Sequence, residues 1–315
     1  MSLAGITPVD VRGARWRLRL RNTRQFIGRF ASRRDGVVGA AILAFFVLLA
    51  LAPDLFAGPL QTVTTATGGP LEPPSAVHLL GTDEAGRDLL NLTIHGARVS
   101  MVIGLLATVI TIVLGAVIGI VSGYVGGRSD QVLMRLTDFF LVLPTFVLAI
   151  VLAPIILDIV GTDAEFFGIR ATLFVIIVVI GVTSWASTAR IIRSQTLSIK
   201  ERMFVDRARV IGSGPGRIMR RHILPNVVNL IVAQAVLTFA GAIFTETTLS
   251  FIGLGDPFAP SWGQLLNAAQ ESGAPGLGAW WYIAPPAICV VVVILAFTLV
   301  GNALDDVLNP KSTTR

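Results

Sequence analysis

The chain has 315 residues, of which 53% are hydrophobic and only 14% are charged, and its mean hydropathy is +0.76. Because a globular domain in water carries about 25% charged residues to solvate its surface, these figures exclude an ordinary soluble protein. A single cysteine excludes an internal disulfide and a thiolate metal cluster, and the net charge of +6 comes from basic clusters beside apolar runs, which is typical of membrane topology rather than of nucleic-acid binding.

The chain starts with a basic segment, residues 1–35, which holds nine of the 25 Lys and Arg. Within it Trp16, Leu20, Ile27 and Phe30 recur at helical spacing amid arginines. This pattern favours an amphipathic helix that lies in the plane of the lipid headgroups. A disordered basic tail that only fixes the membrane topology is the alternative.

Six long uncharged windows follow, each close to or beyond the roughly 20 residues that a helix needs to cross a membrane. They are 36–53, 99–127, 139–157, 171–189, 222–245 and 272–304. The first predicts an uncleaved transmembrane helix over 36–56, because Pro53 disfavours a cleaved twin-arginine signal. The last begins with a Gly/Pro-rich stretch, which places its helix at about 281–303.

The sequence therefore predicts an all-α polytopic membrane protein with six transmembrane helices. Its parts are a basic tail with the interfacial helix (1–35), a first helix (36–56), an external loop (57–95), a five-helix core (96–304) that contains a cytoplasmic loop (190–225), and a C-terminal tail (305–315). Of the 25 Lys and Arg, 22 fall in segments that six crossings place on one side. The positive-inside rule then predicts that both termini are cytoplasmic.

The sequence lacks the motifs that catalysis or cofactor binding would need. Neither Lys200 nor Lys311 stands in a G-x-x-x-x-G-K-[ST] frame, so the chain is not expected to bind ATP by a P-loop. The histidines His78, His95 and His222 are far apart and form no zinc motif. The sequence predicts a protein that is not an enzyme and that holds no cofactor or metal of its own.

The basic loop over 190–225 is unusual for a membrane protein, because it is too long for a simple turn. It carries nine Lys and Arg and predicts a helix over Ile199–Ile211. A Gly-Ser-Gly-Pro-Gly break follows, and Leu224 and Pro225 open the fifth crossing. Such a loop either presents a short helix to a soluble partner or only fixes topology.

This loop resembles the loop of ATP-binding-cassette (ABC) importer permeases, whose pattern is E-A-A, three residues, G, nine residues, I-x-L-P. The positions that match the pattern or stand in it are Asp206, Arg207, Ala208, Gly212, Leu224 and Pro225. Three positions depart from it: Asp206 replaces Glu, Arg207 replaces Ala, and His222 replaces Ile.

Three further stretches resemble the second permease subunit of dipeptide, oligopeptide and nickel importers. They are Leu80–Asp88 with Gly96–Ser100, Glu246–Gly255 with Pro260–Gly263, and Gly301–Pro310. The external signature in the first of them consists of Gly81, Thr82, Asp83, Gly86, Arg87 and Asp88. The resemblance covers about residues 35–310.

The resemblance implies the type I ABC importer permease fold and a chain that forms half of a translocation path for peptides or similar small solutes. It implies a homologous second permease, two cytoplasmic ATP-binding subunits or domains that hold ATP and Mg, an external substrate-binding protein or lipoprotein, and surrounding lipid of a bacterial inner membrane. Two alternatives stay open: an importer for nickel or another small ligand, and a stand-alone channel or structural subunit.

The resemblance also implies roles for particular residues. Coupling to the ATPase is expected of Phe204, Asp206, Ala208, Arg209, Gly212, Arg217, Arg220, His222, Leu224 and Pro225. The alternative is that Gly212 only ends a helix and that the arginines only fix topology. Glu246, in an apolar run, is expected either at a gate or permease contact, or as a carboxylate that caps the following loop.

Overall fold

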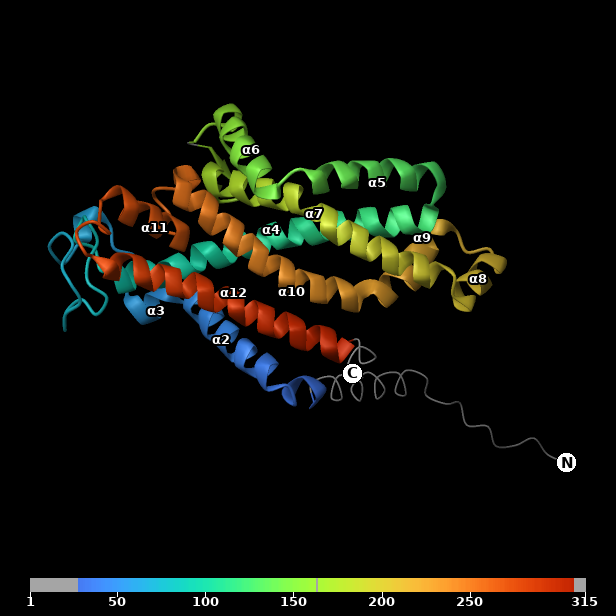
Figure 1. Cartoon of the computed structure of the whole chain (residues 1–315), viewed down its shortest axis with the longest axis horizontal. Coiled ribbons are helices and arrows are strands. Elements are labelled where there is room, and N and C mark those ends of the chain that lie inside the picture. Colours follow the sequence, from blue (N-terminus) through green and yellow to red (C-terminus); the bar gives the residue numbers. More distant parts are fainter. Residues whose placement is uncertain (1–27, 163, 309–315) are drawn as a thin grey trace.

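Five of the apolar windows become long helices, because every backbone N–H and C=O inside lipid must be hydrogen-bonded within its own segment. The computed structural model describes residues 28–162 and 164–308. The five helices that are long and apolar enough to cross a membrane are α2 (Arg34–Leu51), α4 (Leu89–Val125), α7 (Ala171–Lys200), α10 (Leu224–Leu249) and α12 (Trp280–Leu308). They run along the long axis of the molecule (Figure 1).

The third predicted crossing, over 139–157, is not one straight helix. Two helices, α5 (Gly127–Val142) and α6 (Thr145–Val160), meet at 91° across a short break. Pro144 lies in this break, and proline disfavours the helical conformation of the residue before it. Figure 1 shows α5 running along the bundle and α6 turning away from it. If this bent pair is one crossing, the described chain has the six crossings that the sequence predicts.

The first crossing also differs from its prediction, which ran over 36–56. Helix α2 ends at Leu51, and Pro53 begins a separate short helix, α3 (Pro53–Ala57). Proline fits the first turn of a helix, where its missing N–H has no partner, but not the interior. The chain therefore changes direction where the sequence analysis expected the helix to continue.

Helix α4 begins ten residues before the window that predicted it. Asp88 caps its first turn by accepting a hydrogen bond from the backbone N–H of Asn91. Arg98 lies within the helix, and its guanidinium donates to the carbonyls of Ala50 and Leu51 at the end of α2. Arg98 was the charged residue that bounded the predicted window at residue 99. Free carbonyls at the end of α2 stabilise its charge inside α4.

The centre of the bundle is the contact between α4 and α7. Gly115, Gly119 and Gly123 form a row on α4 that faces α7, and a Cβ atom on Gly119 would lie 2.6 Å from the carbonyl oxygen of Ala189. Small residues four apart let two membrane helices approach closely. The two helices thus form a tightly packed pair on which the other crossings lie.

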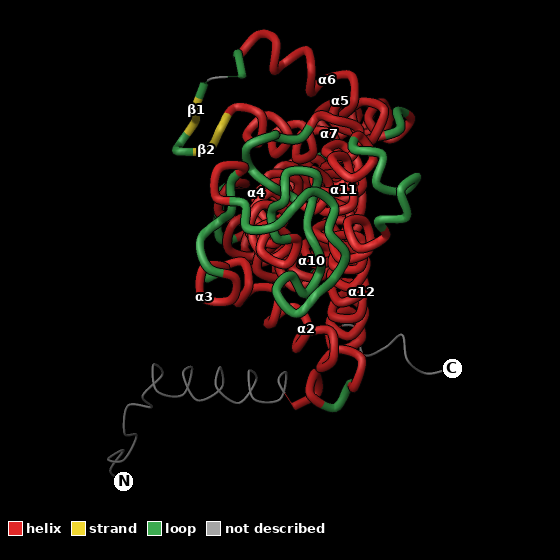
Figure 2. The backbone as a smooth tube through the Cα atoms, turned by 90° about the vertical axis from the view of Figure 1, so that its left-hand side faces the viewer, coloured by secondary structure: helices red, strands yellow, loops and turns green. Residues whose placement is uncertain are grey.

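Short elements connect the crossings. They are a 3₁₀ turn η1 (Val63–Thr65), an antiparallel hairpin of β1 (Glu165–Phe166) and β2 (Ile169–Arg170), α8 (Met203–Val210), α9 (Pro215–Ile218), the π-helical turns η2 (Met219–Ile223) and η3 (Ser250–Leu254), and α11 (Trp262–Glu271). We call residues 57–88 with 250–279 the α11 end, and residues 201–223 the α8 end. They lie at opposite ends of the bundle (Figure 1). Loops of the α11 end cover the helix ends that face the viewer in Figure 2.

Both tails of the chain fall mainly outside the described residues. The predicted interfacial helix rests on Trp16, Leu20 and Ile27, which are not described, and the C-terminal tail is described only as far as residue 308, still within α12. Within the described part, Arg33 pairs with Asp306 at 3.1 Å, so the start of α2 and the end of α12 lie together. Both are on the side of the bundle that carries the α8 end (Figure 1).

Candidate functional site

Helix α8 lies at the tip of the α8 end, beyond the long helices. Its inward face buries Val205 and Ala208 in a cluster with Ile192 of α7 and Val227 of α10. To reach this cluster the chain turns between Lys200 and Met203, so the helix predicted over Ile199–Ile211 is two helices. The free energy gained by burying this apolar face exceeds the cost of interrupting the helix.

The segment between the fourth and fifth crossings is shorter than the predicted loop over 190–225. Helix α7 continues to Lys200, and α9 begins at Pro215 and leads through η2 into α10. Only residues 201–214, with α8 at their centre, therefore project from the bundle. Pro225 lies in the first turn of α10, where proline is tolerated, and Leu224 is partly exposed beside it.

The outward face of α8 is apolar and exposed. Met203 is 70% exposed, Val210 88% and Ile211 83%, and Phe204 is 40% exposed. Contiguous apolar groups that protrude from the end of a membrane bundle are typical of a protein interaction site. Phe204 also lies near the imidazole of His222, with 6.2 Å between the ring centroids, which connects α8 to η2.

Gly212 ends α8 in a Schellman motif. Its φ is +82°, its N–H donates to the carbonyl of Arg209 at 2.9 Å, and the N–H of Ser213 donates to the carbonyl of Ala208 at 3.0 Å. A left-handed residue is needed there, and glycine adopts that conformation without strain. The alternative reading of Gly212 as a helix cap is therefore what the geometry shows, while a Cβ atom at Gly212 would have no atom within 4 Å.

Arg209 is held in place on the outside of α8. It donates to the carboxylate of Asp206 at 3.0 Å, and its guanidinium carbon lies 5.6 Å from the ring centroid of Tyr124. The side chain of Tyr124, with a smaller contribution from Asp206, raises the pKa of Arg209 above its ordinary value. This arginine therefore stays charged and positioned while α8 remains folded.

Three exposed arginines lie beside α8. Arg217, Arg220 and Arg221 line a hollow of about 390 Å³ with Gly216. Among the described residues, none of these arginines makes an ion pair. The structure therefore brings the predicted coupling residues of four elements, α8, α9, η2 and α10, to one end of the molecule, where the positive charge of these three arginines is not neutralised by acidic side chains of the described residues.

At the opposite end, the external signature folds into a turn that holds the start of α4. The carboxylate of Asp83 is 0% exposed and accepts from the backbone N–H groups of Ala85 and Arg87 and from the Arg87 guanidinium, at 2.6–2.9 Å. Gly86 has a φ of +77°, and a Cβ atom there would lie 2.2 Å from the carbonyl oxygen of Gly68. These residues serve the local structure, because their polar groups are consumed within the turn.

The remaining signature residues extend the same network. Thr82 donates to the carbonyl of Gly69 at 2.7 Å and accepts from the N–H of Glu72 at 2.8 Å. Gly81, at a φ of +72°, passes close to Trp281. Asp88 caps α4 and also lies 2.9 Å from Nδ1 of His78. No role for His78 was predicted from the sequence, because no motif indicates its contact with Asp88, ten residues away.

Glu246 is enclosed entirely by its own chain. It is 0% exposed, and its carboxylate accepts from the hydroxyls of Ser100 at 3.1 Å, Ser250 at 2.9 Å and Thr247 at 3.4 Å. The Ser100 hydroxyl in turn accepts from the N–H of Trp262, so Glu246 joins α4, α10 and the start of α11. A side chain without exposed area makes no direct contact with a second permease in this arrangement. The geometry is that of a satisfied carboxylate that fixes the segment after α10.

Comparison with known proteins places this architecture among transport proteins. The family model described as "Binding-protein-dependent transport system inner membrane component" matches residues 115–314. The chain is 36% identical over 288 residues to the dipeptide transport system permease protein DppC of Bacillus subtilis (strain 168), covering 90% of this chain and 84% of the relative. It is 37% identical over 246 residues to the oligopeptide transport system permease protein OppC of Lactococcus lactis subsp. cremoris (strain SK11), covering 78% and 79%.

A solved structure supports the fold. A chain of the MetNI methionine ABC transporter in an inward-facing conformation aligns with a TM-score of 0.53 and 19% identity. The alignment covers 71% of this chain and 97% of that chain. At this level of identity the likeness shows the fold alone.

Proposed function

Because the chain belongs to the family of binding-protein-dependent transport system inner membrane components, we propose that it forms half of the translocation path of an ATP-driven peptide importer. The alignment with the dipeptide permease carries this proposal, since it spans 90% of the chain and so includes both ends of the bundle. A homologous second permease would supply the other half of the path. An external binding protein would deliver the peptide.

Separate ATP-binding subunits would supply the energy, with ATP and Mg held in those subunits. The apolar face formed by Met203, Phe204, Val210 and Ile211 suits a hydrophobic groove, and the unpaired arginines beside it suit acidic side chains around that groove. We therefore assign ATPase docking to the α8 end as a whole.

Movement of the docked subunits would reach the membrane through the inner face of α8. Val205 and Ala208 pack in one cluster with Ile192 of α7 and Val227 of α10. A displacement of α8 therefore acts on two crossings at once, because a close-packed cluster transmits movement instead of absorbing it. Gly212 contributes by ending α8 where the chain must turn back toward α9.

The charge distribution supports an orientation with the α8 end and both termini in the cytoplasm. Nine of the 25 Lys and Arg lie in residues 190–221 and nine more in residues 1–35. Lys and Arg accumulate on the cytoplasmic side of membrane proteins. The α11 end would then face the external binding protein.

The test is purification of the tagged full chain in mild detergent, identification of co-purifying chains by mass spectrometry, and assay of the complex in liposomes. We expect a second permease, ATP-binding subunits and ATP-dependent uptake of a labelled dipeptide when the binding protein is present. Uptake of nickel in place of the dipeptide would overturn the peptide assignment. A homo-oligomer without ATP hydrolysis would overturn the importer and favour a channel.

A further inference from the structure

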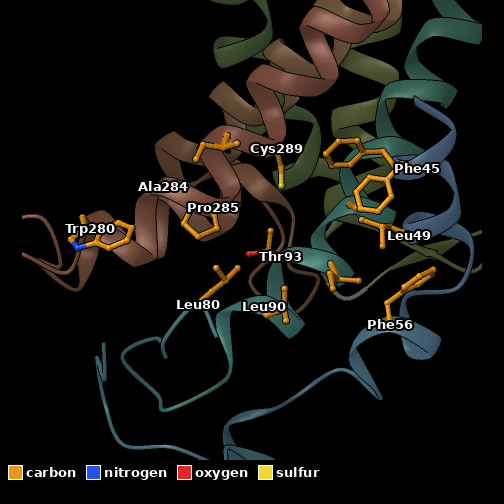
Figure 3. Close-up of a pocket in the computed structure, with 14 residues that line it drawn as sticks. Phe45, Leu49, Phe56, Leu80, Leu90, Thr93, Trp280, Ala284, Pro285 and Cys289 are labelled. Atoms are coloured by element: carbon orange, nitrogen blue, oxygen red, sulfur yellow. The ribbon is translucent and has the colours of Figure 1, made fainter. Parts of the chain in front are cut away.

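An apolar cavity of about 500 Å³ lies between α2, α3, α4 and α12, near the α11 end (Figure 3). This volume falls in the range of roughly 300–1,000 Å³ that is usual for ligand pockets. Its floor is buried and includes Phe46, Leu49 and Ala97, whereas three aromatic side chains at its rim, Phe45, Phe56 and Trp280, are each more than half exposed. The cavity therefore opens outward from the bundle and not into the α4–α7 centre.

One polar group in the cavity has no partner. Thr93 is 6% exposed, and its hydroxyl is buried without a hydrogen bond. A threonine in a helix normally donates to the carbonyl four residues before it. Figure 3 shows the Thr93 oxygen pointing into the cavity instead. An unpartnered buried hydroxyl costs free energy, so this site calls for a ligand with a hydrogen-bond acceptor.

The depth of the cavity in the membrane restricts that ligand. Trp280 begins α12, and Phe45 and Leu49 come from the last two turns of α2, so the cavity lies at the ends of two crossing helices, near the boundary of the bilayer. Tryptophan is enriched at this boundary between the headgroups and the hydrocarbon. The ligand must therefore be apolar over most of its length and must carry an uncharged acceptor at the level of the boundary.

We propose that this cavity binds an acyl chain of a membrane phospholipid, with the ester carbonyl of that chain accepting a hydrogen bond from Thr93. An acyl chain matches the apolar lining, and its ester carbonyl is a free acceptor. A transmembrane helix of a second subunit offers free backbone carbonyls only in its last turn, because its other carbonyls are bonded within the helix. Helices α2 and α12 pack directly through Gly36 and Gly39, and the bound lipid fills the gap on the α11 side of this contact.

Photo-crosslinking tests the proposal on the full chain with its co-purifying subunits. The complex is placed in nanodiscs of phosphatidylethanolamine and phosphatidylglycerol whose acyl chains carry a diazirine, and adducts are mapped by mass spectrometry. We expect adducts on the floor residues Phe46, Leu49 and Ala97 at several times the frequency seen on Val113 and Val117, which are exposed on α4. Equal frequencies would overturn the proposal.

A variant that fills the cavity sharpens this result. Ala284→Phe adds a ring to the α12 wall and should reduce floor adducts at least five-fold, whereas Ala44→Phe, on the exposed face of α2 outside the cavity, should not change them. If Ala284→Phe does not fold, an apolar maleimide on Cys289, the only cysteine of the chain, fills the cavity after folding. Floor adducts that persist after filling would contradict the site.

The Thr93 hydroxyl is tested separately. Thr93→Val keeps the shape but removes the hydroxyl, and loss of one hydrogen bond should reduce phospholipid retention in native mass spectrometry by about three-fold to ten-fold. Thr93→Ser should retain the lipid. Crosslinks from Cys289 to a second permease, with no lipid adducts on the floor, would instead assign the cavity to a subunit contact.

Discussion

The two ends of the bundle use their motif residues in opposite ways. At the α11 end the signature residues Thr82 and Asp83 are fully buried, and their polar groups are bonded within residues 69–87. At the α8 end Met203, Val210 and Ile211 are exposed, and Arg217, Arg220 and Arg221 make no ion pair among the described residues. Motif residues at the α11 end build the scaffold, whereas the exposed residues at the α8 end are free for the docking proposed above.

This difference separates stability from coupling. A side chain whose bonds are made within the fold affects the free energy of unfolding when it is removed. A side chain that protrudes affects only a complex in which it becomes buried. Substitutions at the two ends should therefore change different measurements: thermal stability at the α11 end and binding of the ATPase at the α8 end.

The largest effect is expected at Asp83. Asp83→Ala leaves the Arg87 guanidinium and two backbone N–H groups without their acceptor. Removing one partner of a buried pair typically costs about 3–5 kcal/mol. Thermal unfolding of the purified protein, followed by tryptophan fluorescence, should show a large decrease in Tm. Asp206→Ala, which breaks an exposed pair at the α8 end, should change the stability by at most about 0.5 kcal/mol. Similar losses for both variants would contradict the contrast between the ends.

The next largest effect is expected at Val210, and it concerns binding. Val210→Glu places a carboxylate on the apolar face of α8 and should weaken capture of the ATPase by about 2 kcal/mol, or roughly thirty-fold. Its Tm should stay unchanged, because the side chain is 88% exposed. Val77→Glu is the matched control, since Val77 is 79% exposed at the α11 end. ATPase titration in detergent measures the affinity, and an equal loss for Val77→Glu would remove the special status of α8.

Smaller effects on the free energy of unfolding, with opposite signs, are expected at two glycines of the α8 end. Gly212→Ala forces alanine into a left-handed conformation and should destabilise the protein by about 1 kcal/mol. Gly216→Ala, in α9 with no atom within 4 Å of its Cβ, should instead be neutral or stabilise by up to about 1 kcal/mol. Chemical unfolding of both variants distinguishes them. A loss at Gly216 equal to that at Gly212 would mean that the turn is not specific to the left-handed residue.

The sequence predicts the crossings formed by α7, α10 and α12, although α12 contains Pro285 and Pro286 and α7 continues past its predicted end to Lys200. It misses the start of α4, because a charge was taken to end a crossing, whereas Arg98 satisfies the last carbonyls of α2. It also misses the bend at Pro144, because the hydropathy of a segment does not show whether its helix is straight or bent. The row of Gly115, Gly119 and Gly123 was readable as a helix contact from its four-residue spacing, although the partner helix was not.

The residues of the candidate sites could be predicted from the sequence, but their contacts and their exposure could not. The resemblance pointed to Glu246 and Gly212, and the structure adds their surroundings: three hydroxyl donors to Glu246 and a left-handed cap at Gly212. Ser100 lies 146 residues from Glu246, and no local pattern connects positions so far apart. Exposure is likewise a property of the folded chain, which is why a buried Asp83 and an exposed Asp206 look alike in the sequence.

The smallest effect is expected at the arginines beside α8. It separates the electrostatic contribution to ATPase binding from the contribution of the apolar face. Arg220 lines the 390 Å³ hollow and is exposed, so Arg220→Gln should weaken ATPase binding by only about 0.5 kcal/mol, roughly two-fold. Because exposed charges are screened, this loss should disappear at high ionic strength, while the loss from Val210→Glu should largely remain. Arg128→Gln, on α5 and outside the hollow, should have no effect at either salt concentration. If the Arg220 and Arg128 variants behave alike, the basic residues act only on topology, and the apolar face of α8 alone accounts for docking.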